Sequence, residues 1–95
     1  MIRSYRNQET EQFVTGAKVS KRFQAFKDQA ETRMRILESA TSVKDLAALR
    51  SNHFEKLEGD RKGQFSIRIN EKWRICFAWP SGADGPENVE IADCH

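Results

Sequence analysis

The sequence predicts a single α+β domain in which a small, mostly antiparallel sheet packs on one face against two or three helices. Three observations lead to this fold class. The chain has 95 residues, which suits one hydrophobic core and leaves no room for a second. Helical periodicity dominates up to about residue 52, and the chain then alternates with the period of two that strands show. We therefore expect residues 1–95 to form one domain.

The helical patterns occupy the first half of the chain. Residues 2–6 favour a short opening strand, residues 7–15 a helix closed by Gly16, and residues 41–52 another short helix. A longer helix is predicted to begin at Ser20, because apolar residues then recur at spacings of three and four. These residues form one stripe that should face the core: Phe23, Phe26, Ala30, Met34, Leu37 and Ala40.

The strand patterns occupy the second half. A polar turn at residues 59–63 has glycine at both ends and predicts a hairpin. Proline and glycine mark residues 80–86 as a loop. The alternating segments around these turns predict strands over residues 64–69, 73–79 and 88–93.

Charge is unevenly distributed along the chain. Residues 1–80 carry a net charge of +6, whereas residues 81–95 contain four acids and neither lysine nor arginine. A basic body is typical of polyanion-binding surfaces, although many ordinary soluble domains share it. No apolar run approaches the roughly 18 to 20 residues of a membrane-spanning helix. Acids occupy positions 9 and 11, where a secretory signal would be apolar, so we expect a cytoplasmic protein without membrane association.

The sequence favours neither a metal site nor a cofactor site. It has no phosphate-binding loop, dinucleotide fingerprint, zinc-protease motif or nucleophile elbow. Its two histidines are far apart, and its two cysteines lack the spacing of metal ligands. We therefore expect chemistry that uses side chains alone.

Two arginines are predicted to share one face of the sheet. Alternation puts Phe65, Ile67 and Ile69 on one side of their strand and Arg68 on the other, and it puts Arg74 on that second side of the next strand. The pair could bind an anion. Solvated or salt-bridged arginines on a sheet surface are the alternative.

The final predicted strand offers an acid and a base. Asp93 and His95 are two residues apart and should project to the same side. A carboxylate can orient and charge an imidazole, which makes this pair suitable for proton transfer near neutral pH. A frayed chain end is the alternative interpretation.

The chain as a whole resembles the HigB-type branch of the RelE toxin superfamily, the plasmid maintenance system killer proteins. The resemblance rests on the run from Leu57 to Phe77, which contains GDRKGQFSIRINEKWRICF, and on the ending EIADCH. It extends to the opening residues MIRSY and so spans essentially the full length.

The resemblance implies a RelE-like fold and ribosome-dependent cleavage of messenger RNA. In such cleavage the substrate's own 2′-hydroxyl attacks the adjacent phosphate, so no metal is needed and the protein supplies a base, an acid and positive charge. It also implies a helix-turn-helix antitoxin of the HigA type as partner, with operator DNA bound only through the toxin–antitoxin complex.

The family's functional positions can be matched to this sequence one by one. The resemblance implies catalytic roles for four residues and substrate-binding roles for two more. The catalytic candidates are His95, Asp93, Arg74 and Arg68, and the substrate-binding candidates are Lys56 and Arg61.

Two positions depart from the family pattern. Glu58 stands where some members have lysine, and Cys94 stands where many have tyrosine. These departures leave open a non-catalytic RelE-fold module that binds an antitoxin or RNA. A general RNA-binding domain is a third alternative.

Overall fold

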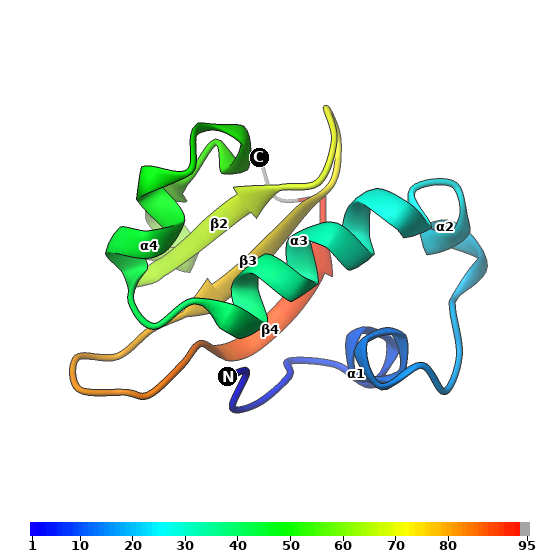
Figure 1. Cartoon of the computed structure of the whole chain (residues 1–95), viewed down its shortest axis with the longest axis horizontal. Helices are drawn as coiled ribbons and strands as arrows, with labels where there is room; N and C mark the ends of the chain where they lie inside the picture. Colours follow the sequence, from blue (N-terminus) through cyan, green and yellow to red (C-terminus); the bar gives the residue numbers. More distant parts are fainter. Residues whose placement is uncertain (94–95) are drawn as a thin grey trace.

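The computed structural model describes residues 1–93 and has the predicted α+β architecture (Figure 1). Its four strands form one antiparallel sheet in the order β1-β2-β3-β4. The elements are α1 (Gln8–Thr15), α2 (Lys21–Gln24), α3 (Lys27–Ser39), α4 (Val43–Ala48), the 3₁₀ turn η1 (Arg50–Asn52), β1 (Glu55–Lys56), the 3₁₀ turn η2 (Gly59–Arg61), β2 (Gln64–Arg68), β3 (Arg74–Ala78) and β4 (Glu87–Ala92).

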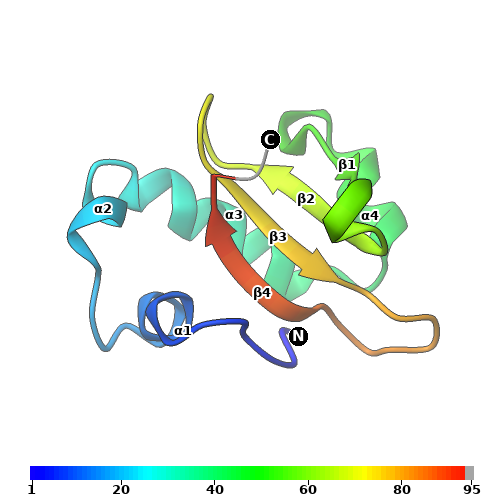
Figure 2. The same ribbon diagram turned by 180° about the vertical axis from the view of Figure 1, so that it is seen from behind.

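The helices and the sheet form two layers with the core between them. Helix α3 crosses in front of the strands in Figure 1 and behind them in Figure 2, so it covers one face of the sheet. The whole predicted helical stripe is buried there against Ile67, Ile75, Phe77 and Ile91 of the strands. The opposite face, toward the viewer in Figure 2, has no described helix lying across it.

Helix α1 begins and ends where the sequence predicts. The Oδ1 atom of Asn7 accepts a hydrogen bond from the Thr10 amide at 2.9 Å, which satisfies one of the free N–H groups at the helix start. Gly16 ends the helix with φ of 80°, a left-handed conformation that glycine adopts without steric cost. Local sequence chemistry is therefore sufficient to define this helix.

The prediction of one long helix from Ser20 is wrong in one respect, because the chain forms two helices there, α2 and α3. Phe26 leaves the helical region with φ of −128° and ψ of 28°. The break lets both Phe23 and Phe26 pack on Trp73, with ring centroids at 6.0 and 5.2 Å. Aromatic packing on the sheet thus outweighs helix continuation, and the described residues contain four α-helices where the sequence predicted three.

The opening strand predicted for residues 2–6 is only partly formed. One parallel bridge joins Tyr5 to Val89, and the amides of Arg3 and Arg6 donate to carbonyls of the β4 side. A regular ladder does not develop because β4 is irregular here: its register to β3 shifts between Cys76 and Ala78, and Asn88 has φ of 52°. The segment therefore lies along the sheet edge without becoming a regular strand.

The hairpin region follows the prediction closely. Strands β2 and β3 pair from Gln64↔Ala78 to Arg68↔Arg74, which places their apolar residues on the helix side of the sheet. Between residues 1 and 93, no helix has both the length and the hydropathy that spanning a membrane requires.

Candidate functional site

The predicted pair of arginines lies on the sheet face opposite the helices. Arg68 and Arg74 are direct partners in the β2–β3 ladder, so their side chains project from the same face. Ser66 and Cys76 form the next pair along this face, and Glu90 of β4 lies opposite Cys76. We call this surface the arginine face.

Arg74 is the most firmly held residue of the arginine face. Its residue surface is only 8% exposed, which rules out the alternative of a solvated surface arginine. Its Nε donates to Ser66 Oγ at 2.7 Å, and its Nη2 donates to the main-chain carbonyl of His53. Two hydrogen bonds thus fix the plane of the guanidinium.

The electrostatic surroundings of Arg74 lower its pKa. Burial has the largest effect, because it disfavours the charged form, and the positive charge of Arg68 acts in the same direction. The carboxylate of Glu55 opposes both. Arginine still remains charged at neutral pH, so the fold holds a poorly solvated cation next to a second one. Such a site attracts an anion.

Arg68 is held less completely than Arg74. Its Nε donates to the carbonyl of Asn70 at 3.1 Å in the turn between β2 and β3, and its side chain is half-buried. The two arginines therefore add two positive charges to the same face from neighbouring strands.

Arg61 reaches the arginine face from η2 and is paired with an acid there. Its Nη1 donates to Glu90 Oε1 at 3.0 Å and to Gln64 Oε1 at 3.2 Å. The same Glu90 oxygen lies 3.7 Å from Arg6 Nε. Because Glu90 belongs to β4 and η2 adjoins β2, the Arg61–Glu90 pair spans the sheet. Any anion that binds here would have to compete with Glu90 for Arg61.

The other candidates from the sequence are placed differently. Lys56 pairs with Phe65, which puts it on the helix side of the sheet edge rather than on the arginine face. Asp93 is exposed and directly follows Ala92, whose Cα partner is Arg74. His95 lies outside the described residues.

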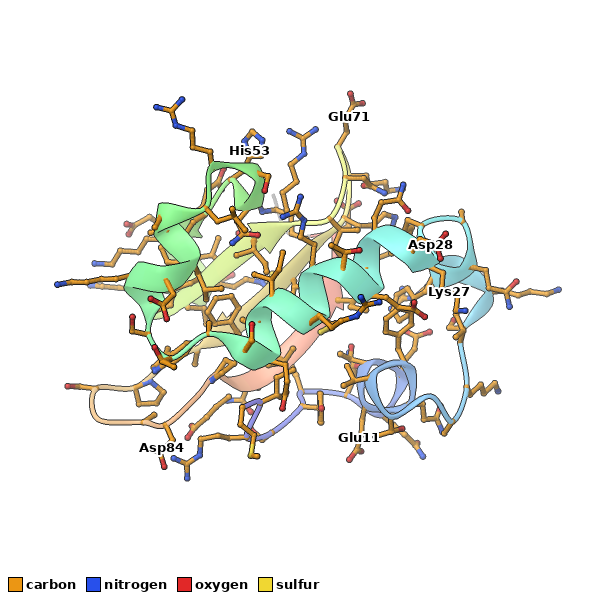
Figure 3. The ribbon with its side chains drawn as sticks, in the orientation of Figure 1. Glu11, Lys27, Asp28, His53, Glu71 and Asp84 are labelled. Atoms are coloured by element: carbon orange, nitrogen blue, oxygen red, sulfur yellow. The ribbon has the colours of Figure 1, made fainter. Side chains whose placement is uncertain are left out.

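Sequence reasoning missed the part that His53 plays in the site. Its backbone has φ of 44°, an uncommon conformation for a residue other than glycine, and its carbonyl accepts the hydrogen bond from Arg74. Its exposed side chain projects at the upper rim of the molecule in Figure 3. No sequence signal marks this conformation, because it depends on contacts across 21 residues.

Ser66 and Glu55 were also not predicted as parts of the site. Ser66 could have been found, because it alternates onto the same face as Arg68. Glu55 acts on Arg74 only through the pairing of β1 with β2. Within residues 1–93, no cluster of three or more histidine, cysteine or acidic side chains could hold a metal ion.

Comparison with known proteins identifies relatives of this chain. A family model described as the RelE-like toxin of type II toxin-antitoxin system HigB matches residues 3–95. Toxin HigB-1 of Vibrio cholerae serotype O1 (strain ATCC 39315 / El Tor Inaba N16961) is 42% identical over 50 residues, a match that covers 53% of each chain. The match thus spans about half the length of this curated relative.

A solved structure shares the fold. The YoeB-YefM complex from Staphylococcus aureus contains a chain that superposes with a TM-score of 0.61 at 18% sequence identity. The superposition covers 100% of this chain and 95% of the other. With the family match over nearly all of its residues, the chain belongs to the HigB-like family of RelE-like toxins of type II toxin–antitoxin systems.

Proposed function

We propose that this toxin is an endoribonuclease that cleaves messenger RNA on the ribosome and thereby stops translation. The observation that carries the proposal is the buried, doubly hydrogen-bonded Arg74 directly opposite Arg68. A fixed guanidinium beside a second cation suits a substrate whose negative charge grows during reaction. RNA meets this description when its 2′-hydroxyl attacks the adjacent phosphate.

The proposed reaction needs no metal. The substrate 2′-oxygen forms a bond to phosphorus as it gives up its proton to a base, and the bond from phosphorus to the 5′-oxygen breaks. The products are a 2′,3′-cyclic phosphate and a 5′-hydroxyl, and the latter takes up one proton. Arg74 and Arg68 would stabilise the charge on the phosphate oxygens at this stage.

The acid and the outer contacts come from the remaining candidates. His95 would protonate the departing 5′-oxygen. Asp93, the residue after Ala92, which pairs with Arg74, would orient the imidazole of His95. Arg61 would release the carboxylate of Glu90 and bind a neighbouring phosphate in its place. Lys56, on the other side of the sheet edge, would contact RNA or ribosome beyond the arginine face.

The partners follow from the same function. Ribosome and messenger RNA are the substrate complex, which places the toxin in the cytoplasm. A helix-turn-helix antitoxin of the HigA type would neutralise it, and the complex, rather than the toxin alone, would bind operator DNA. The opening segment and the exposed positive charges of α2 and α3 are the toxin surfaces to test for antitoxin contact.

A direct test uses purified toxin and programmed ribosomes. Primer extension should show cuts in ribosome-bound messenger RNA and none in the same RNA without ribosomes. Expression in cells without the antitoxin should stop growth and yield the same cuts. A toxin that binds translating ribosomes yet leaves the messenger intact contradicts the enzyme proposal.

A non-catalytic module that binds antitoxin or RNA is the second candidate function. The observation in its favour is the pairing of Arg61 with Glu90, which neutralises one candidate cation. Comparing the parent with Cys94→Tyr separates the two. Equal cleavage by both removes the second candidate, and cleavage gained only in the variant supports it.

A further inference from the structure

We propose that Arg33 and Asn52 are positioning residues that hold the guanidinium of Arg74 in place through the backbone of His53. Their side-chain hydrogen bonds join α3, α4 and η1 to one another. The contacts that connect them to Arg74 run from α3 through the loop after η1.

The first step is the fixation of Asn52. Its side chain is completely buried, and its Nδ2 donates to the carbonyl of Leu46 at 3.1 Å. Its Oδ1 accepts from Arg33 Nη1 at 2.9 Å, and the same nitrogen donates to Ser51 Oγ at 3.2 Å. One half-buried arginine of α3 thus holds two consecutive residues of η1.

The second step is the backbone of His53, which lies between two fixed neighbours. Asn52 is anchored as described, and the ring of Phe54 stacks on that of Phe65 with centroids 5.4 Å apart. Between them His53 adopts φ of 44°. A non-glycine residue pays about 1 kcal/mol or more for this conformation and keeps it only where its surroundings enforce it.

The third step is the hydrogen bond from Arg74 Nη2 to the His53 carbonyl. The direction of that carbonyl depends on the left-handed turn. The other bond of Arg74, from Nε to Ser66 Oγ, comes from the neighbouring strand and does not depend on the loop. Loss of the Arg33 contact should therefore free one end of the guanidinium while leaving the other in place.

The variant to test is Arg33→Gln, which removes the guanidinium but leaves buried Asn52 intact. Arg35→Gln is the matched control, since it removes the same charge from the same helix, and Arg35 borders a groove that α3 forms with α1 and the opening segment. Arg33→Lys restores one donor and should restore part of the effect. Thermal melting of all three shows whether each remains folded.

The first measurement does not depend on the proposed function. Hydrogen exchange of the Arg74 Nη2–H, followed by NMR and assigned through its loss in Arg74→Lys, reports how firmly the guanidinium end at the His53 carbonyl is held. The Nε–H, which bonds Ser66, should change little and serves as an internal reference. We expect exchange to quicken by roughly fivefold or more in Arg33→Gln, to stay within about twofold of wild type in Arg35→Gln, and to fall between them in Arg33→Lys. Exchange that is unchanged in Arg33→Gln, or equally fast in Arg35→Gln, overturns the proposal.

The second measurement rests on the proposed function. In single-turnover cleavage on ribosomes, Arg33→Gln should lower the maximal rate by roughly tenfold, with little change in the ribosome concentration at half-maximal rate. A wild-type rate despite faster exchange would show that positioning by Arg33 has no part in the reaction and would overturn that claim. If wild-type toxin cleaves nothing, the proposed function fails, and the exchange measurement still decides whether Arg33 holds Arg74.

Discussion

At the scale of single residues, Arg74 shows how the sheet both buries and orients a cation. Its pKa is lowered mainly by burial, because burial removes much of the water that would hydrate the charged guanidinium. The bonds to Ser66 and to the His53 carbonyl compensate in part and also set the orientation. A substitution can therefore keep the positive charge of Arg74 and remove the fixed orientation of its side chain.

Replacing Arg74 by lysine keeps the charge but loses the fixed fork of donors. An ammonium group carries its donors on one nitrogen and lacks the planar fork with which Arg74 bonds Ser66 through Nε and His53 through Nη2. We expect single-turnover cleavage on the ribosome to fall by about 100-fold, with ribosome affinity nearly unchanged. Cleavage within a few-fold of wild type would mean that charge alone is sufficient.

Replacing His95 by glutamine tests the proposed acid. Glutamine keeps hydrogen-bonding capacity but has no proton that titrates near neutral pH. Cleavage should fall by about 100-fold or more if His95 protonates the leaving oxygen. A rate close to that of wild type would leave phosphate positioning by the arginines as the source of catalysis.

At the scale of elements, α1 connects the helical layer to the last strand. Asn7 caps its first turn, and the buried Thr10 accepts a hydrogen bond from the Ile91 amide of β4 at 3.1 Å. The start of the helix therefore supports the edge of the sheet as well as itself.

The Asn7→Ala variant should lower the free energy of unfolding by about 1 kcal/mol, because the Thr10 amide loses its partner. Urea unfolding followed by circular dichroism measures the change. Gln8→Ala, one residue away on an exposed position, is the control and should shift the midpoint little. An equal loss in both variants would argue against a capping role.

The contact between α1 and α2 should respond to acid. The pKa of Glu9 is lowered, chiefly by a hydrogen bond from the Ser20 side chain and further by Arg22, whose Nη2 lies 2.6 Å from Glu9 Oε1. The stabilisation is thus fully present above the ordinary value of 4.5 and is lost as pH falls through the lower folded value. Because the pair is exposed, its contribution should be below about 1 kcal/mol.

Melting temperatures of wild type and Glu9→Gln between pH 3 and 7 test this dependence. The melting temperature of wild type should exceed that of Glu9→Gln by a constant amount above about pH 5, and this difference should shrink toward pH 3. An advantage that grows as the solution becomes more acidic would contradict the assigned direction of the pKa shift.

At the scale of the whole molecule, stability should depend on the partner. A chain of 95 residues buries a modest share of its surface, and a ligand that binds only the folded state adds to its stability. An antitoxin at 100 times its Kd should add about 2.7 kcal/mol, or roughly 11 to 22 °C in Tm for a chain of this size. An unrelated helix-turn-helix protein is the control, and equal melting temperatures with and without antitoxin would contradict specific binding.

Local patterns predicted the parts of the molecule that depend on local chemistry. Alternation was sufficient to place Arg68 and Arg74 on one face, and the capping residues defined α1. The break after α2 contains neither glycine nor proline and results from packing on Trp73, which lies far away in sequence. The His53 carbonyl and the Arg61–Glu90 pair likewise depend on contacts between distant segments, so periodicity could not reveal them.

The pairing of the opening segment with β4 has a consequence for how the chain acquires its shape during synthesis. The Asn88 amide donates to Ser4 Oγ across 84 positions, so the opening segment cannot take its place beside β4 until the residues of β4 have been made. Contacts between segments so far apart form slowly, because a long loop must close before they bring any gain. A nascent chain therefore lacks this edge of the sheet, and with it the strand beside Arg74, until residues 87–92 have left the ribosome that makes them. A toxin built in this way cannot complete its arginine face while that stretch is still being translated.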